Sequence, residues 1–94
     1  MIEDVKIALR IASNAYDSEI TDLIAACRAD LQLAGIIPDK ANADTDPLIK
    51  RCIITYVKAE FGYDNAESEK YKASYEMLKR HLMLSNEYTV SEQT

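Results

Sequence analysis

Two stretches of the chain repeat apolar residues at the spacing of one face of an α-helix, and this feature restricts the fold more than any other. A strand would instead alternate apolar and polar residues. The first stretch, over 18–34, carries Ile20, Leu23, Ile24, Cys27 and Leu31. The second, over 47–61, carries Leu48, Ile49, Cys52, Ile53, Tyr56, Val57 and Phe61. The pattern predicts two amphipathic helices that share a core.

The ends of these helices carry recognisable signals. Asp17 or Ser18 is expected to cap the first, and Gly35 follows it where a left-handed residue commonly ends a helix. Asp46-Pro47 opens the second, because aspartate accepts the free amides of the first turn and proline tolerates the first helical position. Gly62 is expected to end it.

Two further helices are predicted with weaker periodicity. One runs from Glu3 to about Ile11. The other begins after a cap at Asp64 or Asn65 and continues to about residue 84, with Glu67 and Glu69 in its first turn. Its apolar stripe consists of Tyr71, Tyr75, Leu78 and Leu82. Only two glycines and two prolines occur in 94 residues, which favours an all-α chain over a turn-rich β fold.

The expected architecture is a compact bundle of about four helices in one domain over 1–84. Residues 36–45 lack periodicity and are interpreted as a long loop between the second and third helices. Residues 85–94 are polar and unpatterned, which predicts a flexible C-terminal tail. The predicted core is Leu23, Ile24, Cys27, Leu31, Ile49, Cys52, Ile53, Tyr56, Tyr75, Leu78 and Leu82.

Charge and residue types argue against several classes of function. The net charge is -5, whereas nucleic-acid binders usually present a basic face. Cys27 and Cys52 have no second ligand at metal-binding spacing, and His81 has no nucleophile or acid patterned around it. No glycine-rich phosphate loop or apolar run of membrane-spanning length occurs. We therefore expect a non-enzymatic protein without cofactor, metal or membrane contact.

Tyrosine is the most distinctive residue type, with six copies beside one phenylalanine. Its ring is apolar while its hydroxyl reaches water or a partner, and such side chains are common at interfaces. Tyr16 and Tyr63 lie at predicted helix junctions, and Tyr88 and Val90 lie in the predicted tail. These four residues are candidate contacts with a partner protein.

Five segments in this order resemble the head-tail connector family, or head-completion adaptors, of tailed bacteriophages and prophages. The resemblance covers residues 2 to about 84. The segments are Leu9-Arg10-Ile11, Asp17 with Ile20, Leu23, Ile24, Ala25 and Ala26, Asp46-Pro47-Leu48-Ile49, the run from Tyr56 to Tyr63, and Ser74-Tyr75-Glu76 with Leu78-Lys79.

This resemblance implies a virion assembly subunit at the head-tail junction that is present in the host cytoplasm during assembly. It implies a homo-oligomeric ring of about a dozen copies beneath the portal protein, which extends the DNA channel and docks a stopper or tail-completion protein. DNA would pass through this ring during packaging without specific binding. Asp39, Lys40 and Asp44 of the 36–45 loop are then candidates for the lumen, where carboxylates would repel phosphate. Tyr88 and Val90 are candidates for anchoring on the portal.

Two other functions fit a short helical chain. One is a small phage- or prophage-encoded regulatory module that captures a partner helix on an apolar surface. The other is a DNA-associated protein with a local basic patch at Lys50, Arg51 and Lys58. The helix after Asp46 begins with Pro47, Leu48 and Ile49, which are poor residues for reading base edges.

Overall fold

The computed structural model describes residues 1–61 and 66–90, and all regular secondary structure in these ranges is helical. This confirms the all-α class. The four longer helices are α1 (Ile2–Leu9), α2 (Asp17–Leu33), α4 (Pro47–Glu60) and α5 (Ser68–Met83). Two helices of four residues, α3 (Pro38–Ala41) and α6 (Asn86–Thr89), were not predicted.

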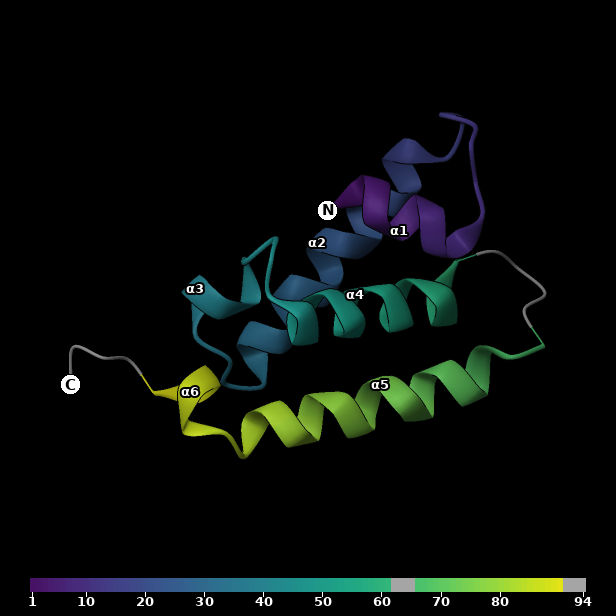
Figure 1. Cartoon of the computed structure of the whole chain (residues 1–94). Helices are drawn as coiled ribbons and strands as arrows, with labels where there is room; N and C mark the ends of the chain where they lie inside the picture. The colour runs from purple at the N-terminus through teal and green to yellow at the C-terminus, as the bar shows by residue number, and fades with distance from the viewer. Residues whose placement is uncertain (62–65, 91–94) are drawn as a thin grey trace.

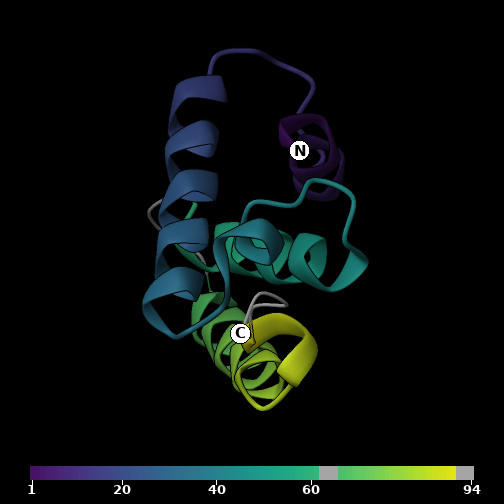
Figure 2. The same ribbon diagram turned by 90° about the vertical axis from the view of Figure 1, so that its left-hand side faces the viewer.

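The helix α4 occupies the middle of the molecule. Figures 1 and 2 show α1 and α2 on one side of α4 and α5 along the other, with α3 and α6 near the same end. The molecule measures 44 × 24 × 18 Å. Because α4 contacts α1, α2 and α5, its apolar side chains join the two sides into one core.

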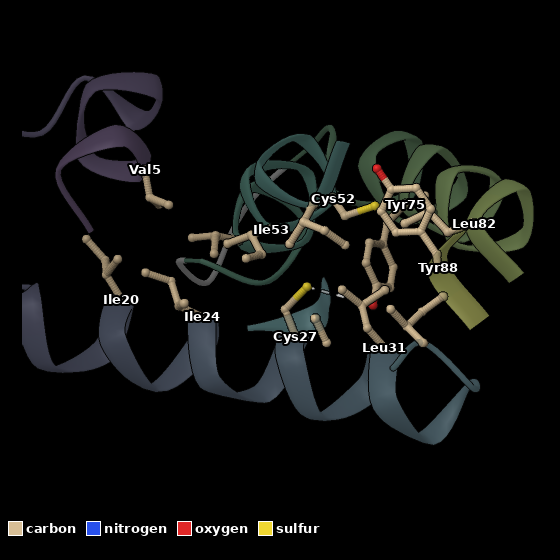
Figure 3. Close-up of a cluster of buried hydrophobic side chains, with 14 residues drawn as sticks. Val5, Ile20, Ile24, Cys27, Leu31, Cys52, Ile53, Tyr75, Leu82 and Tyr88 are labelled. Atoms are coloured by element: carbon tan, nitrogen blue, oxygen red, sulfur yellow. Dashed lines mark hydrogen bonds between the residues drawn. The ribbon is translucent and has the colours of Figure 1, made fainter. Parts of the chain in front are cut away.

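The core runs along α2 and α4 from α1 to α6 (Figure 3). Val5 and Ile20 meet at one end, and Tyr75, Leu82 and Tyr88 lie near the other. Eight of the eleven residues expected in the core are buried: Ile24, Cys27, Leu31, Ile49, Cys52, Ile53, Tyr75 and Leu82. The other three, Leu23, Tyr56 and Leu78, are half-buried and pack against this cluster.

The first helix ends two residues earlier than predicted because Arg10 adopts a left-handed conformation, with φ of 61°. The amide of Arg10 donates to the carbonyl of Ile7, and that of Ile11 donates to the carbonyl of Lys6. This Schellman arrangement satisfies the last carbonyls of α1. A non-glycine residue therefore occupies a position that glycine usually takes.

The start of α2 differs from the expected side-chain cap. The helix begins at Asp17 after Tyr16, and no side chain caps it. The carboxylate of Asp17 lies 2.8 Å from the ammonium of Lys6, which is buried and also donates to Asn14. Asp17 thus pairs with the ammonium of Lys6. Burying this cation without a partner would cost free energy.

The end of α2 has the expected glycine. Gly35 has φ of 108°, its amide donates to Gln32, and the amide of Ile36 donates to Leu31. Ile36 and Leu31 are both buried, which supplies the hydrophobic contact that accompanies a Schellman motif.

The predicted 36–45 loop contains α3. Ile37 is extended, and Pro38 takes the first helical position, where its missing amide hydrogen is not needed. Four residues are too short to show helical periodicity, so this segment has no pattern signal in the sequence. Ile36 and Ala41 are buried, which fixes α3 to the body.

The start of α4 confirms the predicted cap. The carboxylate of Asp46 accepts the amides of Leu48 and Ile49 at 2.9 and 3.1 Å, with Pro47 at the first helical position. At its other end α4 stops at Glu60, and the expected terminator Gly62 lies outside the described residues.

The C-terminal part differs most from the sequence-based expectation. Ser68 begins α5, and its hydroxyl donates to the carbonyl of Ala59 at 2.6 Å. The expected caps Asp64 and Asn65 lie outside the described residues. Residues 86–89 of the predicted tail form α6 and return onto the body, while residues 91–94 are not described.

Candidate interaction surfaces

One surface is formed by α3, α6 and the C-terminal part of α2. The guanidinium of Arg28, on α2, donates to the carbonyls of Ala41 and Ala43 and to the carboxylate of Asp44 at 2.7 Å. Arg28 therefore holds both the end of α3 and the turn after it. Sequence reasoning missed this residue, because an arginine within a helix gives no sign of a distant partner.

Two groups of predicted site residues meet on this surface. The ammonium of Lys40, on α3, lies 3.4 Å from the carboxylate of Glu87 and 5.2 Å from the centre of the Tyr88 ring. Asp39 precedes Lys40 in the chain and is exposed. Lys40, expected at the lumen, and Tyr88, expected at the portal, are thus neighbours.

Tyr88 is a structural residue in the subunit rather than an exposed tail contact. Its side chain is 5% exposed, and its hydroxyl donates to Asp46 at 2.9 Å. Burial, followed by the hydrogen bond to Asp46, raises the pKa of Tyr88 to about 12. Its carbonyl accepts the amide of Ile37. Asp46 thus caps α4 and fastens α6 at the same time.

Of the other predicted contact residues, Tyr16 and Val90 are described and lie at different places on the molecule. Tyr16 is 48% exposed and packs edge-on against Phe61 at 5.6 Å, at the start of α2. Val90 is 46% exposed and follows α6. Tyr63 lies outside the described residues. Tyr16 and Val90 are not brought together.

A second surface is a groove of about 750 Å³ between α4 and α5, called here the α4/α5 groove. Apolar side chains of Leu48, Ile54, Met77 and Leu78 line it, together with the cations Lys50, Arg51 and Lys58. Among the lining residues that the structure describes, none is acidic. The described residues that line it are Thr45, Pro47, Leu48, Lys50, Arg51, Ile54, Thr55, Lys58, Tyr71, Ser74, Met77 and Leu78.

The candidate DNA patch of Lys50, Arg51 and Lys58 therefore belongs to a groove with apolar walls. The sequence carries a partial signal, because Leu48, Arg51, Thr55 and Lys58 follow each other at helical spacing on one face of α4. The groove itself depends on α5, which no local pattern places beside that face.

A partly buried polar cluster joins α2 to α5. The hydroxyl of Tyr75 donates to the carboxylate of Asp30 at 2.6 Å, and Lys79 donates to the same oxygen at 2.9 Å. Partial burial of Asp30 opposes its ionisation, but these hydrogen bonds outweigh it and lower its pKa. Tyr75 also packs edge-on against Tyr56 at 5.1 Å. The cluster is a structural bridge between two helices.

The cysteines have the chemistry of buried core thiols. Cys27 lies 3.8 Å from the hydroxyl of Tyr75, and burial raises its pKa to about 12. Burial, and then the nearby charge of Asp46, raises the pKa of Cys52 to about 11. A thiolate is the nucleophilic and metal-binding form, so neither residue has an environment that favours reaction.

Residues 1–61 and 66–90 contain no cluster of three or more His, Cys, Asp or Glu that could hold a metal ion. His81 is exposed in the last turn of α5. No helix in these two ranges is long and apolar enough to cross a membrane.

The described features define a small helical protein with a groove between α4 and α5 and a separate surface around α3 and α6. The chain belongs to the phage connector protein family, whose model matches residues 1–89. This confirms the resemblance seen in the sequence. The family is one of structural phage proteins, so the chain is a virion component that assembles with other virion proteins. Comparisons with curated proteins and with solved structures gave no match.

Proposed function

We propose that the chain is a head-tail connector subunit that forms a closed ring beneath the portal, extends the DNA channel and docks a stopper or tail-completion protein. The observation that carries this proposal is the family match over residues 1–89, nearly the whole chain. A rigid helical body with exposed apolar residues at separated places suits a subunit that contacts several neighbours. These residues include Ile7, Tyr16, Leu33, Leu84 and Val90.

The lumen is proposed to be lined by the surface around α3. Asp39 is exposed, and the side chain of Asp44 is 67% exposed although it pairs with Arg28. Repeated around a ring, these carboxylates would repel the phosphates of passing DNA. Lys40 is turned toward Glu87 and Tyr88, so its charge is partly balanced.

The portal contact is proposed to involve Tyr16 and Val90 as exposed apolar anchors, with Tyr63 as a further candidate. Tyr88 would join them only if α6 leaves the body on binding, because its side chain is buried in the free subunit. Ordering or rearrangement of short segments is common in regulated assemblies.

The deciding experiment is production of phage particles without the chain. Loss of head-tail joining, with DNA-filled heads and free tails accumulating, is expected, and complementation with the wild-type chain should restore infectious particles. Joined, infectious particles in its absence would refute the connector role. Complementation with Asp39→Lys and Asp44→Lys tests the lumen, where delayed DNA exit is expected and unchanged exit would contradict it.

The α4/α5 groove supports a second candidate, a regulatory module that captures one partner helix. Its apolar lining and volume suit helix-in-groove recognition. Such a module would form a complex of fixed small stoichiometry, whereas a connector forms rings, so electron microscopy of the assembled protein separates the two.

A further inference from the structure

The outer face of α2 carries an exposed stripe that includes acidic side chains, which are absent from the described lining of the α4/α5 groove. Glu19, Asp22, Ala26, Ala29 and Leu33 follow each other at helical spacing, and all are exposed. This α2 stripe is acidic at its start, small in its middle and apolar at its end, where Leu33 is 88% exposed.

The groove is complementary to this stripe in charge and in shape. It carries Arg51 and Lys58, besides Lys50, which pairs with Asp4 of its own chain at 3.6 Å, whereas the stripe carries two carboxylates. Small side chains such as Ala26 and Ala29 let a helix approach closely, and the hollow between α4 and α5 gives it room. Leu48 and Met77, which are 48% and 58% exposed, offer Leu33 an apolar contact.

The two surfaces also match in length. Residues 48–58 of α4 span about 15 Å, and residues 22–33 of α2 span about 17 Å at the rise of an α-helix. If Leu33 packs on Leu48 and Met77, Asp22 comes opposite Lys58. This register runs α2 of one copy antiparallel to α4 of the other.

The stripe and the groove lie on different sides of the molecule. The inner face of α2, with Ile20, Ile24, Cys27 and Leu31, is buried, so its stripe points away from the core. The groove opens between α4 and α5 and uses other positions of α4 than the buried Ile49, Cys52 and Ile53. A contact between different surfaces of identical chains is heterologous and continues from copy to copy.

We propose that the α2 stripe of one copy of this chain docks in the α4/α5 groove of the next copy. This inference rests on the proposed ring and names the surfaces that would build it. The occupant is a second copy of the chain, because its α2 stripe supplies the carboxylates that the groove lacks and an apolar residue, Leu33, that fits the apolar wall of the groove.

Two blocked variants test the contact. The groove variant carries Leu48→Lys and Met77→Lys, and the stripe variant carries Asp22→Lys and Ala29→Lys, so the two altered surfaces repel each other as well. All four positions are exposed, so the fold should persist. A control variant exchanges Glu69→Lys and Lys70→Glu, whose side chains are 91% and 75% exposed on α5. Circular dichroism verifies the fold of each, and sedimentation velocity over a wide concentration range gives its mass.

The wild type and the control variant are expected to associate with rising concentration, whereas each blocked variant stays a single chain. An equal mixture of the blocked variants should form a species of twice the single-chain mass and nothing larger, because one intact stripe meets one intact groove. Failure of the mixture to pair, or association of a blocked variant like the wild type, would overturn the inference.

A wild type that stays a single chain at every concentration would also overturn this docking. The connector role is judged separately by head-tail joining in particles. Particles that join normally with the groove variant would reject these surfaces and leave the connector role standing.

Discussion

At the residue scale, two positions with positive φ carry different amino acids. Arg10 ends α1 at φ of 61°, and Gly35 follows α2 at φ of 108°. A side chain in the left-handed region costs roughly 1–2 kcal/mol, which glycine avoids. A Cβ at Gly35 would meet no atom within 4 Å, so only the backbone conformation requires glycine there.

Arg10→Gly should therefore stabilise the protein, and Gly35→Ala should destabilise it. We expect the free energy of unfolding to rise by about 0.5–1 kcal/mol for Arg10→Gly. Glycine removes the backbone strain of the folded state, but it also increases the conformational entropy of the unfolded chain, which offsets part of the gain. For Gly35→Ala the free energy of unfolding should fall by about 1–2 kcal/mol. Urea denaturation followed by circular dichroism measures both, and equal effects of the two changes would contradict this account.

Asp30 makes the stability of the fold depend on pH in the acidic range. Its folded pKa is lower than its ordinary value of 3.8, because hydrogen bonds from Tyr75 and Lys79 outweigh partial burial. The carboxylate therefore contributes stability that is complete above about pH 4 and is lost as pH falls through the folded pKa.

The variant Asp30→Asn should show this dependence by difference. We expect the wild type to be more stable than Asp30→Asn at neutral pH. The difference in stability between the two proteins should become smaller as pH falls below about 4. Thermal unfolding at a series of pH values measures this difference. A Glu69→Gln control, at a side chain that is 91% exposed, should leave the pH profile near that of the wild type. A difference in stability between wild type and Asp30→Asn that does not change with pH would refute the role of Asp30.

At the element scale, α6 and α4 share one carboxylate. Asp46 accepts two amides of the first turn of α4 and the hydroxyl of Tyr88 from α6. The pairing explains how four residues of α6, too few to be stable alone, keep a defined place. The bond from the Ile37 amide to the Tyr88 carbonyl connects α6 with the residue that precedes α3.

A double-mutant cycle tests this shared carboxylate. Asp46→Ala should lower the free energy of unfolding by about 1–2 kcal/mol through the lost cap, and Tyr88→Phe by about 1 kcal/mol through the lost hydrogen bond. The double variant should lose less than the sum, because both changes remove the same bond. Asp46→Asn, which can still cap, is the control, and strictly additive losses would show that Tyr88 and Asp46 act independently.

At the scale of the whole molecule, both cysteines lie in the same core, so the rate at which their thiols react measures unfolding of the protein. Cys27 and Cys52 are both buried at 0% exposure, with pKa values of about 12 and about 11. Both thiols are therefore protonated and covered at pH 8 in the folded protein.

A disulfide reagent such as Ellman's reagent should thus label neither cysteine of the folded protein on the time scale of minutes at pH 8. Both should react at once in concentrated urea, and the labelling rate at intermediate urea should follow the unfolding transition. Fast labelling of one thiol without denaturant would instead show local opening of the helices around it.

The class of fold and the main helices could be predicted from the sequence alone. Helical periodicity is written in residues only three and four positions apart, and the Asp46-Pro47 cap is local as well, so α2 and α4 need no distant information. The same holds for the glycine after α2 and for most of the core, since the face with the apolar stripe is the face that becomes buried.

Contacts between distant residues were decided by the tertiary structure. Asp46 with Tyr88, Arg28 with the end of α3, and the α4/α5 groove each join segments that no local pattern connects. For this reason the residues after 84 were expected to be a mobile tail, although Tyr88 is anchored in the core. Local spacing determines helices because their hydrogen bonds are local, whereas surfaces and anchors exist only after separate helices have packed together.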